Sequence, residues 1–162
     1  LSAILEPVNL TRRIYGFDSF SGFPSLSEKD AAGFGVNVRV GDLYADSEQE
    51  ILALSAINDS TRFLGHIPKV KLIKGDACDT IPRFLEENPH LLVSLLFLDF
   101  DLYEPTRVAL KHILPRMPRG AELDNPLWPG ETMAMLAECG AANLKMQRFE
   151  FDPYIGFAVI GE

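Results

Sequence analysis

An unbroken apolar segment, residues 91–98, constrains the fold more than any other part of the sequence, because two acids, Asp99 and Asp101, follow it directly. The segment is apolar except for Ser94 and shows no alternation of polar and apolar residues. This pattern predicts a strand covered on both faces, as in parallel sheets flanked by helices. Asp99 would then follow the carboxyl end of the strand, where open α/β sheets place their ligands. The alternative is a solvated loop in which Asp101 or Thr106 caps the next helix.

The composition restricts the class of protein. A chain of 162 residues that is 47% hydrophobic is expected to form one domain with its own core and not a disordered segment. Fifteen basic and twenty-three acidic residues give a net charge of −8, which argues against nucleic-acid binding and favours a cation or a small ligand. No apolar run reaches the roughly 20 residues that span a bilayer, so we expect a cytoplasmic protein that does not bind membranes.

Other segments of the sequence show patterns of strands and helices that alternate along the chain. Short strands are predicted at 13–17 and 70–74, and each is followed by an acid, Asp18 and Asp76. A terminal hairpin is predicted from 144–151 and 155–160. The sequence therefore predicts an α/β, doubly wound, Rossmann-like fold with a mostly parallel sheet and a C-terminal antiparallel hairpin. The predicted helices cover residues 47–58, about 80–88, 105–117 and 129–138.

The region before the second predicted strand has two expected features. Residues 27–46 hold three glycines and scattered charges without periodicity, which is typical of a loop or lid that closes over ligands. The helix at 47–58 is expected to begin with Ser47 as N-cap and Glu50 in the capping-box position. Its apolar face is expected to contain Ile51, Leu54 and Ile57.

Three acids, Asp18, Asp76 and Asp99, occupy the ends of three successive predicted strands. A carboxylate in the position of Asp18 can accept hydrogen bonds from both hydroxyls of a ribose. Asp76 can receive the exocyclic amine of adenine, and Asp99 lies nearer the group that would be transferred. Aspartate is also frequent in loops because it forms turns, so the order of the three acids carries more weight than each one alone.

The same residues lie in three motifs that resemble the macrocin O-methyltransferase family of S-adenosylmethionine-dependent enzymes, which methylate sugar hydroxyls in bacterial natural products. The resemblance covers nearly the whole chain. The motifs are YGFDSFSGFP at 15–24, GDACDTIP at 75–82, and LDFDLYEPT at 98–106, of which the last is the most specific.

The resemblance implies an O-methyltransferase whose cofactor is S-adenosylmethionine, whose substrate is a small sugar-like molecule, and whose assembly is a homodimer. It implies that Asp99 is the catalytic base and that Asp99 and Glu122 bind magnesium, which would lower the pKa of the acceptor hydroxyl. The residues implied to bind the cofactor are Phe17, Asp18, Ser19 and Phe20 on the ribose side, Asp76, Ala77 and Asp79 on the adenine side, and Asp99 with Phe100 after the third strand.

The chain departs from the family pattern in two places. The family has a first strand with a glycine-rich loop, and no counterpart precedes Leu1. The family also has a fifth strand ending in two acids, whereas here Gly120 is followed closely by Glu122, as if about five apolar residues were lost. We therefore expect residues 1–162 to form a single methyltransferase domain that is truncated at its N-terminus and lacks the first strand. By the same reasoning, we expect the fifth strand to be missing.

Alternatives remain for the function and for some motifs. The chain could be a catalytically silent relative that binds the cofactor or a partner subunit, or an N-methyltransferase that needs no metal. The segment WPGET at 128–132 either shapes the acceptor pocket or anchors the start of a helix, with Trp128 in the core. Phe20 and Phe23 either stack on the ligand or fill the edge of the core.

Overall fold

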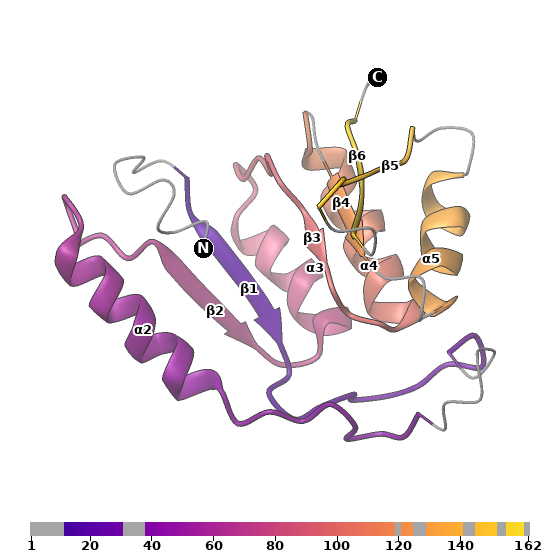
Figure 1. The fold of residues 1–162 in the computed structure, drawn as a ribbon, viewed down its shortest axis with the longest axis horizontal. Coiled ribbons are helices and arrows are strands. Elements are labelled where there is room, and N and C mark those ends of the chain that lie inside the picture. The colour runs from indigo at the N-terminus through magenta and orange to yellow at the C-terminus, as the bar shows by residue number, and fades with distance from the viewer. Residues whose placement is uncertain are drawn as a thin grey trace. The chain divides into compact units, whose positions relative to one another are not determined.

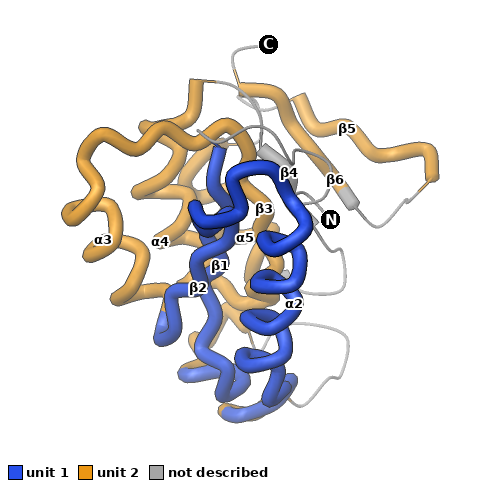
Figure 2. Tube along the Cα trace, turned by 90° about the vertical axis from the view of Figure 1, so that its left-hand side faces the viewer, with its two compact units in different colours: residues 1–24, 41–76 blue, residues 25–40, 77–162 orange. Residues whose placement is uncertain are grey.

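The computed structural model describes residues 12–30, 38–118, 121–124, 129–140, 145–151 and 155–160, with the backbone alone at 121–124, 129 and 155 (Figure 1). The chain divides into two compact units, coloured separately in Figure 2. Unit 1 consists of Leu1–Pro24 and Gly41–Asp76, and unit 2 consists of Ser25–Val40 and Ala77–Glu162. Among the described residues, no helix is both long and apolar enough to cross a membrane.

Unit 1 contains a parallel pair of strands, β1 (Ile14–Asp18) and β2 (Val70–Lys74). Both strands are rich in aliphatic and aromatic residues, which favour the pleated conformation, and both were predicted at these positions. Their register pairs Asp18 with Lys74. The carboxyl ends of the two strands therefore meet at one edge, where the backbone N–H of Gly75 donates to the carbonyl of Asp18 at 2.9 Å.

The predicted helix of unit 1 is confirmed as α2 (Glu48–Thr61) with Ser47 at its N-cap position, but the expected side-chain cap and buried face are wrong. Ser47 has φ −109° and ψ −3°, outside the extended region usual for an N-cap, and its side chain makes no capping hydrogen bond. Ile51, Leu54 and Ile57 are 36%, 58% and 61% exposed. Leu52 is also exposed and lies on the other side of the helix from Leu54 and Ile57. The apolar side chains therefore do not form one buried stripe.

Unit 2 contains a four-stranded sheet in the order β3 (Phe97–Leu98), β4 (Ala121–Asp124), β6 (Ile155–Ala158) and β5 (Gln147–Arg148). The first pair is parallel, and the other two pairs are antiparallel, so the predicted C-terminal hairpin is confirmed. The expectation that a strand is missing after Gly120 is corrected by β4. Four residues suffice there, because β4 is paired on both sides by backbone hydrogen bonds.

The helices of unit 2 are α3 (Ala77–Glu87), α4 (Tyr103–Ile113), which continues into the short 3₁₀ helix η1 (Leu114–Arg116), and α5 (Pro129–Cys139). α4 packs against both α3 and α5. The core of the unit forms because α4 buries one face, as its apolar spacing predicts. Its most buried side chains include Ile81, Leu98, Thr106 and Leu110.

The strand predicted from the apolar segment at 91–98 is much shorter than expected, and one face of it is not covered. Leu96 and Leu98 are buried, whereas Leu95 and Phe97, which alternate with them, are 54% and 51% exposed. Phe97 and Leu98 are the residues of this segment that pair with β4, so the strand is two residues long. The earlier part is held by Arg116, whose carbonyl accepts from the N–H of Val93 at 3.0 Å and whose guanidinium donates to the carbonyls of Leu85, Asn88 and Pro89.

Candidate functional site

In unit 1, Asp18 is held in a tight turn at the end of β1. Its Oδ1 accepts a hydrogen bond of 2.7 Å from the backbone N–H of Phe20, and the hydroxyl of Ser19 donates to the carbonyl of Gly22 at 2.7 Å. Phe20 has φ +51°, in the left-handed region, which the turn requires. The side chain of Asp18 is exposed. Its carboxylate is thus oriented by the turn and still open to solvent.

The aromatic residues of this turn have a structural role. Phe20 and Phe23 are only 8% and 7% exposed, so the described structure favours core packing over ligand stacking for both. The segment is held by two backbone hydrogen bonds, from Phe23 to the carbonyl of Asp42 and from Gly41 to the carbonyl of Phe23. Gly22 has φ +76° and lies too close to the carbonyl of Gly41 to accept a side chain.

Asp76 lies two residues beyond Lys74, the strand partner of Asp18. Parallel pairing therefore brings Asp18 and Asp76 to the same edge of unit 1, as the order of the acids predicted. Lys74 forms an ion pair of 2.5 Å with Glu48, and the hydrogen bond within this pair raises the pKa of Lys74. Its Nζ also lies 5.7 Å from the ring centre of Phe20. Phe17, also predicted to bind the cofactor, is half-buried in β1.

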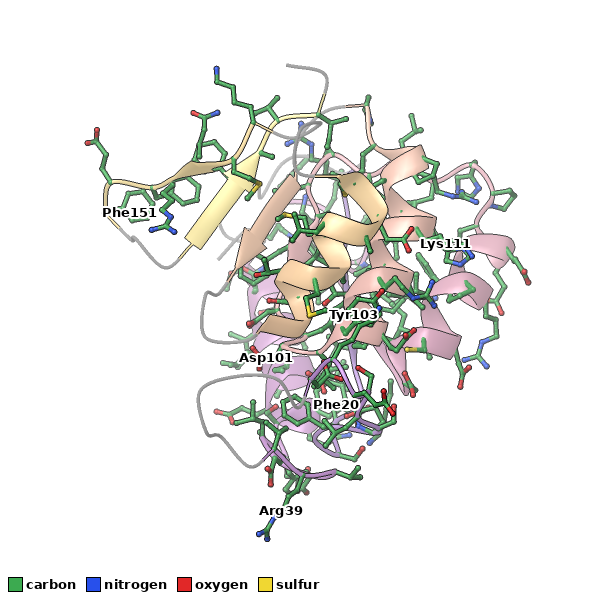
Figure 3. All side chains as sticks on the ribbon, turned by 90° about the vertical axis from the view of Figure 1, so that its right-hand side faces the viewer. Phe20, Arg39, Asp101, Tyr103, Lys111 and Phe151 are labelled. Carbon is green, nitrogen blue, oxygen red and sulfur yellow. The ribbon has the colours of Figure 1, made fainter. Side chains whose placement is uncertain are left out.

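In unit 2, the other predicted site residues lie in two places. Ala77 is buried and Asp79 exposed in the first turn of α3, where an acid interacts favourably with the helix dipole. Asp99 and Phe100 lie in the loop between β3 and α4, and Asp99 is exposed. The loop includes Asp101, whose φ of +62° is unusual for a residue other than glycine. Asp101 and Tyr103, near the start of α4, are labelled in Figure 3.

Glu131, in the first turn of α5, contacts this loop with a buried carboxyl group. It is 4% exposed, and its Oε1 accepts a hydrogen bond of 3.1 Å from the backbone N–H of Phe100 and a longer one of 3.5 Å from the hydroxyl of Thr106. Burial raises the pKa of Glu131 to about 8; the hydrogen bond from the Phe100 N–H opposes this shift, and the nearby charges of Asp101 and Asp99 add to it. Glu131 is therefore mostly protonated at neutral pH.

A second buried acid, Asp30, contacts the start of α4. Its Oδ1 accepts from the backbone N–H of Tyr103 at 2.7 Å, and its Oδ2 accepts from the N–H and the hydroxyl of Ser27, both at 2.7 Å. Lys29 lies over the Tyr103 ring, with Nζ 3.6 Å from its centre. Gly130 is packed so closely that a Cβ there would lie 2.4 Å from Oδ1 of Asp30. The starts of α4 and α5 therefore meet at Asp30. The lid expected at 27–46 is not tested, because residues 31–37 lie outside the described part.

The strand register bears on the predicted metal site. Glu122 lies opposite Phe97, and Leu123 lies opposite Leu98. One residue further on, Asp124 and Asp99 follow the last paired positions, so Asp124 is an additional acid near Asp99 in the register. The side chains of Glu122 and Asp124 lie outside the described part. The side chains that are described contain no group of three or more His, Cys, Asp or Glu residues placed to hold a metal ion.

The sequence profile of the family described as Macrocin-O-methyltransferase (TylF) matches residues 1–123. The chain belongs to the macrocin O-methyltransferase family. No curated protein matches it. The resemblance carried by the three sequence motifs is thereby confirmed.

Solved structures agree with this membership. The chain is similar to the crystal structure of CalS11, a calicheamicin methyltransferase, with 31% identity and a TM-score of 0.88 over 99% of this chain and 65% of that one. A structure of CalS11 without ligand, described as a TDP-rhamnose 3′-O-methyltransferase, gives 31% identity and a TM-score of 0.76 over 99% and 64% of the two chains. The O-methyltransferase NovP, at 21% identity and a TM-score of 0.63 over 99% and 67%, shares the fold. The chain spans about two thirds of the length of these relatives, and their fold confirms the predicted methyltransferase-like α/β class.

Three residues near the candidate site of this macrocin O-methyltransferase family member were not found from the sequence: Asp30, Glu131 and Asp124. Asp30 and Glu131 act through contacts that are distant along the chain, which local patterns do not reveal. Glu131 lies within the WPGET segment, whose expected role as a helix start is confirmed, whereas Trp128 lies outside the described residues. A signal was present in the three acids at 99–104, but such acids are also typical of first helical turns.

Proposed function

We propose that this chain is the core of an O-methyltransferase that uses S-adenosylmethionine to methylate a hydroxyl of a sugar or a glycosylated natural product. The observation that carries the proposal is the family match over 1–123, joined to 31% identity with a sugar O-methyltransferase over 99% of the chain. Because that relative is described as acting on TDP-rhamnose, a nucleotide-linked deoxysugar is the first substrate class to test.

Unit 1 provides the residues proposed for the nucleoside side of the cofactor. The carboxylate of Asp18 is oriented by its hydrogen bond to Phe20, so its other oxygen can accept from ribose hydroxyls at little entropic cost. Asp76 lies at the same edge and is proposed for the adenine amine. Ser19 contributes to the turn by bonding Gly22 and is proposed to act through its position. Phe17 and, through its backbone in the turn, Phe20 are proposed from the same unit. Ala77, Asp79 and Phe100 of unit 2 complete the proposed cofactor-binding set.

Asp99 is the proposed base in unit 2. S-adenosylmethionine supplies the methyl group, and the new carbon–oxygen bond forms as the carbon–sulfur bond breaks and its electron pair remains on sulfur. Asp99 would accept the proton that the hydroxyl loses, because its exposed carboxylate lies at the start of a loop fixed at Phe100. Holding the acceptor in line with the methyl group would supply much of the rate enhancement.

Magnesium binding by Asp99 and Glu122 stays a proposal, with Asp124 as a further oxygen ligand. The described side chains do not form a complete metal site. The proposed homodimer and the proposal that one methyltransferase domain contains both units are likewise open to test.

The first test is calorimetric titration of the protein with S-adenosylhomocysteine, with and without magnesium. Micromolar binding is expected, and its absence in a folded sample would overturn the proposal. Turnover is then measured on TDP-rhamnose, the free sugar and a glycosylated acceptor, with an amine analogue as control. Binding without turnover on any acceptor would favour the catalytically silent alternative, and methylation of the amine without magnesium would favour an N-methyltransferase.

A further inference from the structure

Glu131 differs from the other acids at the helix starts of unit 2. Asp79, in the first turn of α3, is exposed, and Glu104, in the first turn of α4, is partly exposed and pairs with Arg107 at 2.9 Å. An exposed carboxylate is sufficient to interact with a helix dipole. Glu131 is buried instead and contacts a loop 31 positions earlier in the sequence. A role at the start of its own helix therefore does not account for it.

Burial of this carboxyl group has an energetic cost that its contacts offset only partly. Removing an acid from water disfavours its charged form, and the pKa of Glu131 is raised accordingly to about 8. Its Oε2 is buried and has no hydrogen-bond partner among the residues that the structure describes. The favourable contacts are concentrated on Oε1, which accepts from Phe100 and Thr106. Glu131 thus contacts the loop through Oε1, while Oε2 has no hydrogen-bond partner among the described residues.

We infer that Glu131 is a positioning residue for Asp99. Its Oε1 fixes the peptide group between Asp99 and Phe100, and it thereby sets the direction in which the Asp99 side chain leaves the loop. The inference rests on the proposed function, since Asp99 is the proposed base.

The local backbone explains why the loop needs such a contact. β3 is only two residues long, so sheet pairing ends at Leu98, immediately before Asp99. Asp101, two residues later, has φ +62°, a conformation that persists in non-glycine residues only where neighbouring contacts hold it. The N–H of Phe100 lies between these two points. Its hydrogen bond to Glu131, together with the bond from Thr106 in α4, connects the loop to both helices that follow it.

The test compares Glu131→Ala, Glu131→Gln and the control Glu138→Ala. Glu138 lies two turns later in α5, where it pairs with Arg107 of α4 at 3.7 Å. Glutamine keeps an oxygen that can accept from Phe100, whereas alanine does not. We expect Glu131→Ala to lower kcat about 10- to 100-fold with the acceptor KM and the Kd of S-adenosylhomocysteine changed less than about threefold. Glu131→Gln and Glu138→Ala are expected to stay within about threefold of the wild type in kcat.

Amide hydrogen exchange provides a readout that does not depend on activity. The Phe100 amide is expected to exchange at least about tenfold faster in Glu131→Ala and to be restored in Glu131→Gln, while the Ala109 amide inside α4 stays unchanged. If the alanine variant does not fold, Glu131→Met replaces it, because methionine preserves the volume without an acceptor.

Three results would overturn the inference: a folded Glu131→Ala with wild-type kcat and Phe100 exchange, equal acceleration at Phe100 and Ala109 with kcat unchanged, or a Glu131→Gln variant as impaired as alanine. A wild-type protein that binds no cofactor and turns over no acceptor would overturn the proposed function. The exchange data would still decide whether Glu131 holds the loop.

Discussion

The backbone N–H of Tyr103 donates a hydrogen bond of 2.7 Å to Oδ1 of Asp30, a residue 73 positions earlier in the sequence. Tyr103 is the first residue of α4, and the helix has no side-chain cap from Leu102, the residue before it. Asp30 therefore does from a distant loop what an N-cap residue does locally: it satisfies a helix donor and places negative charge at the helix start.

Asp30→Ala is expected to lower the free energy of unfolding by about 1–3 kcal/mol, because a buried helix donor loses its acceptor. Asp30→Asn is expected to lose less, since its amide keeps one acceptor oxygen. Urea denaturation measures both, with Glu28→Ala at an exposed neighbouring site as control. An Asp30→Ala variant as stable as the control would show that the contact contributes nothing.

Gly130→Ala is expected to destabilise the protein although alanine favours helices. The new Cβ would lie 2.4 Å from Oδ1 of Asp30 and 2.7 Å from the Tyr103 nitrogen. The close approach is expected to cost about 1–3 kcal/mol, against a gain of up to about 1 kcal/mol from helix propensity. The same substitution in an Asp30→Ala background is expected to cost less, because the nearest atom is gone. Greater stability of the single variant would contradict the close packing.

Stability is expected to fall as pH rises from about 4.5 to about 8 through the titration of Glu131. Its pKa is raised to about 8 in the folded state and is near 4.5 when unfolded, so the folded state binds more protons within this range. The stabilisation is complete below about pH 4.5 and is lost through pH 8, on the order of 5 kcal/mol in total. Denaturation at several pH values, with a chelator present, measures it. Glu131→Gln should flatten this slope; an unchanged slope would assign the effect to other groups.

Asp18→Ala is expected to weaken S-adenosylhomocysteine binding by about 1.5–3 kcal/mol, because a charged acceptor for paired hydroxyls is removed. Asp18→Asn can still accept from the Phe20 N–H, so it separates loss of charge from loss of the turn. Calorimetry gives both affinities, and Asp46→Ala, at an exposed acid of the same unit, is the control. Unchanged affinity in Asp18→Ala would refute the ribose assignment.

Asp99→Asn is expected to reduce turnover at least about 100-fold while cofactor affinity changes only a few-fold, because the amide keeps the shape of the side chain and loses its basicity. Single-turnover kinetics and calorimetry on the same samples provide the comparison, with Glu138→Gln as control. A parallel loss of binding and turnover would make Asp99 a structural residue.

Much of the fold could be predicted because its signals are local. β2 was predicted at its observed bounds, and α3, α4 and α5 within about two residues at most ends, since strand propensity and helical periodicity act over a few neighbouring positions. The acids Asp18 and Asp76 were correctly placed at one sheet edge for the same reason. The predictions failed where burial depends on partners: the apolar residues of α2 and Leu92 are exposed although their hydrophobicity predicts burial.

The sequence by itself determined which residues form the elements, where acids follow the strands and to which family the chain belongs. Only the tertiary structure decided that Asp30 and Glu131 are buried and that each holds the backbone near Asp99. The physical reason is the range of the interaction: a hydrogen bond between residues 31 or 73 positions apart forms only after packing brings the segments together. A buried carboxyl group that such packing creates looks, in sequence, like any acid in a loop or at a helix start.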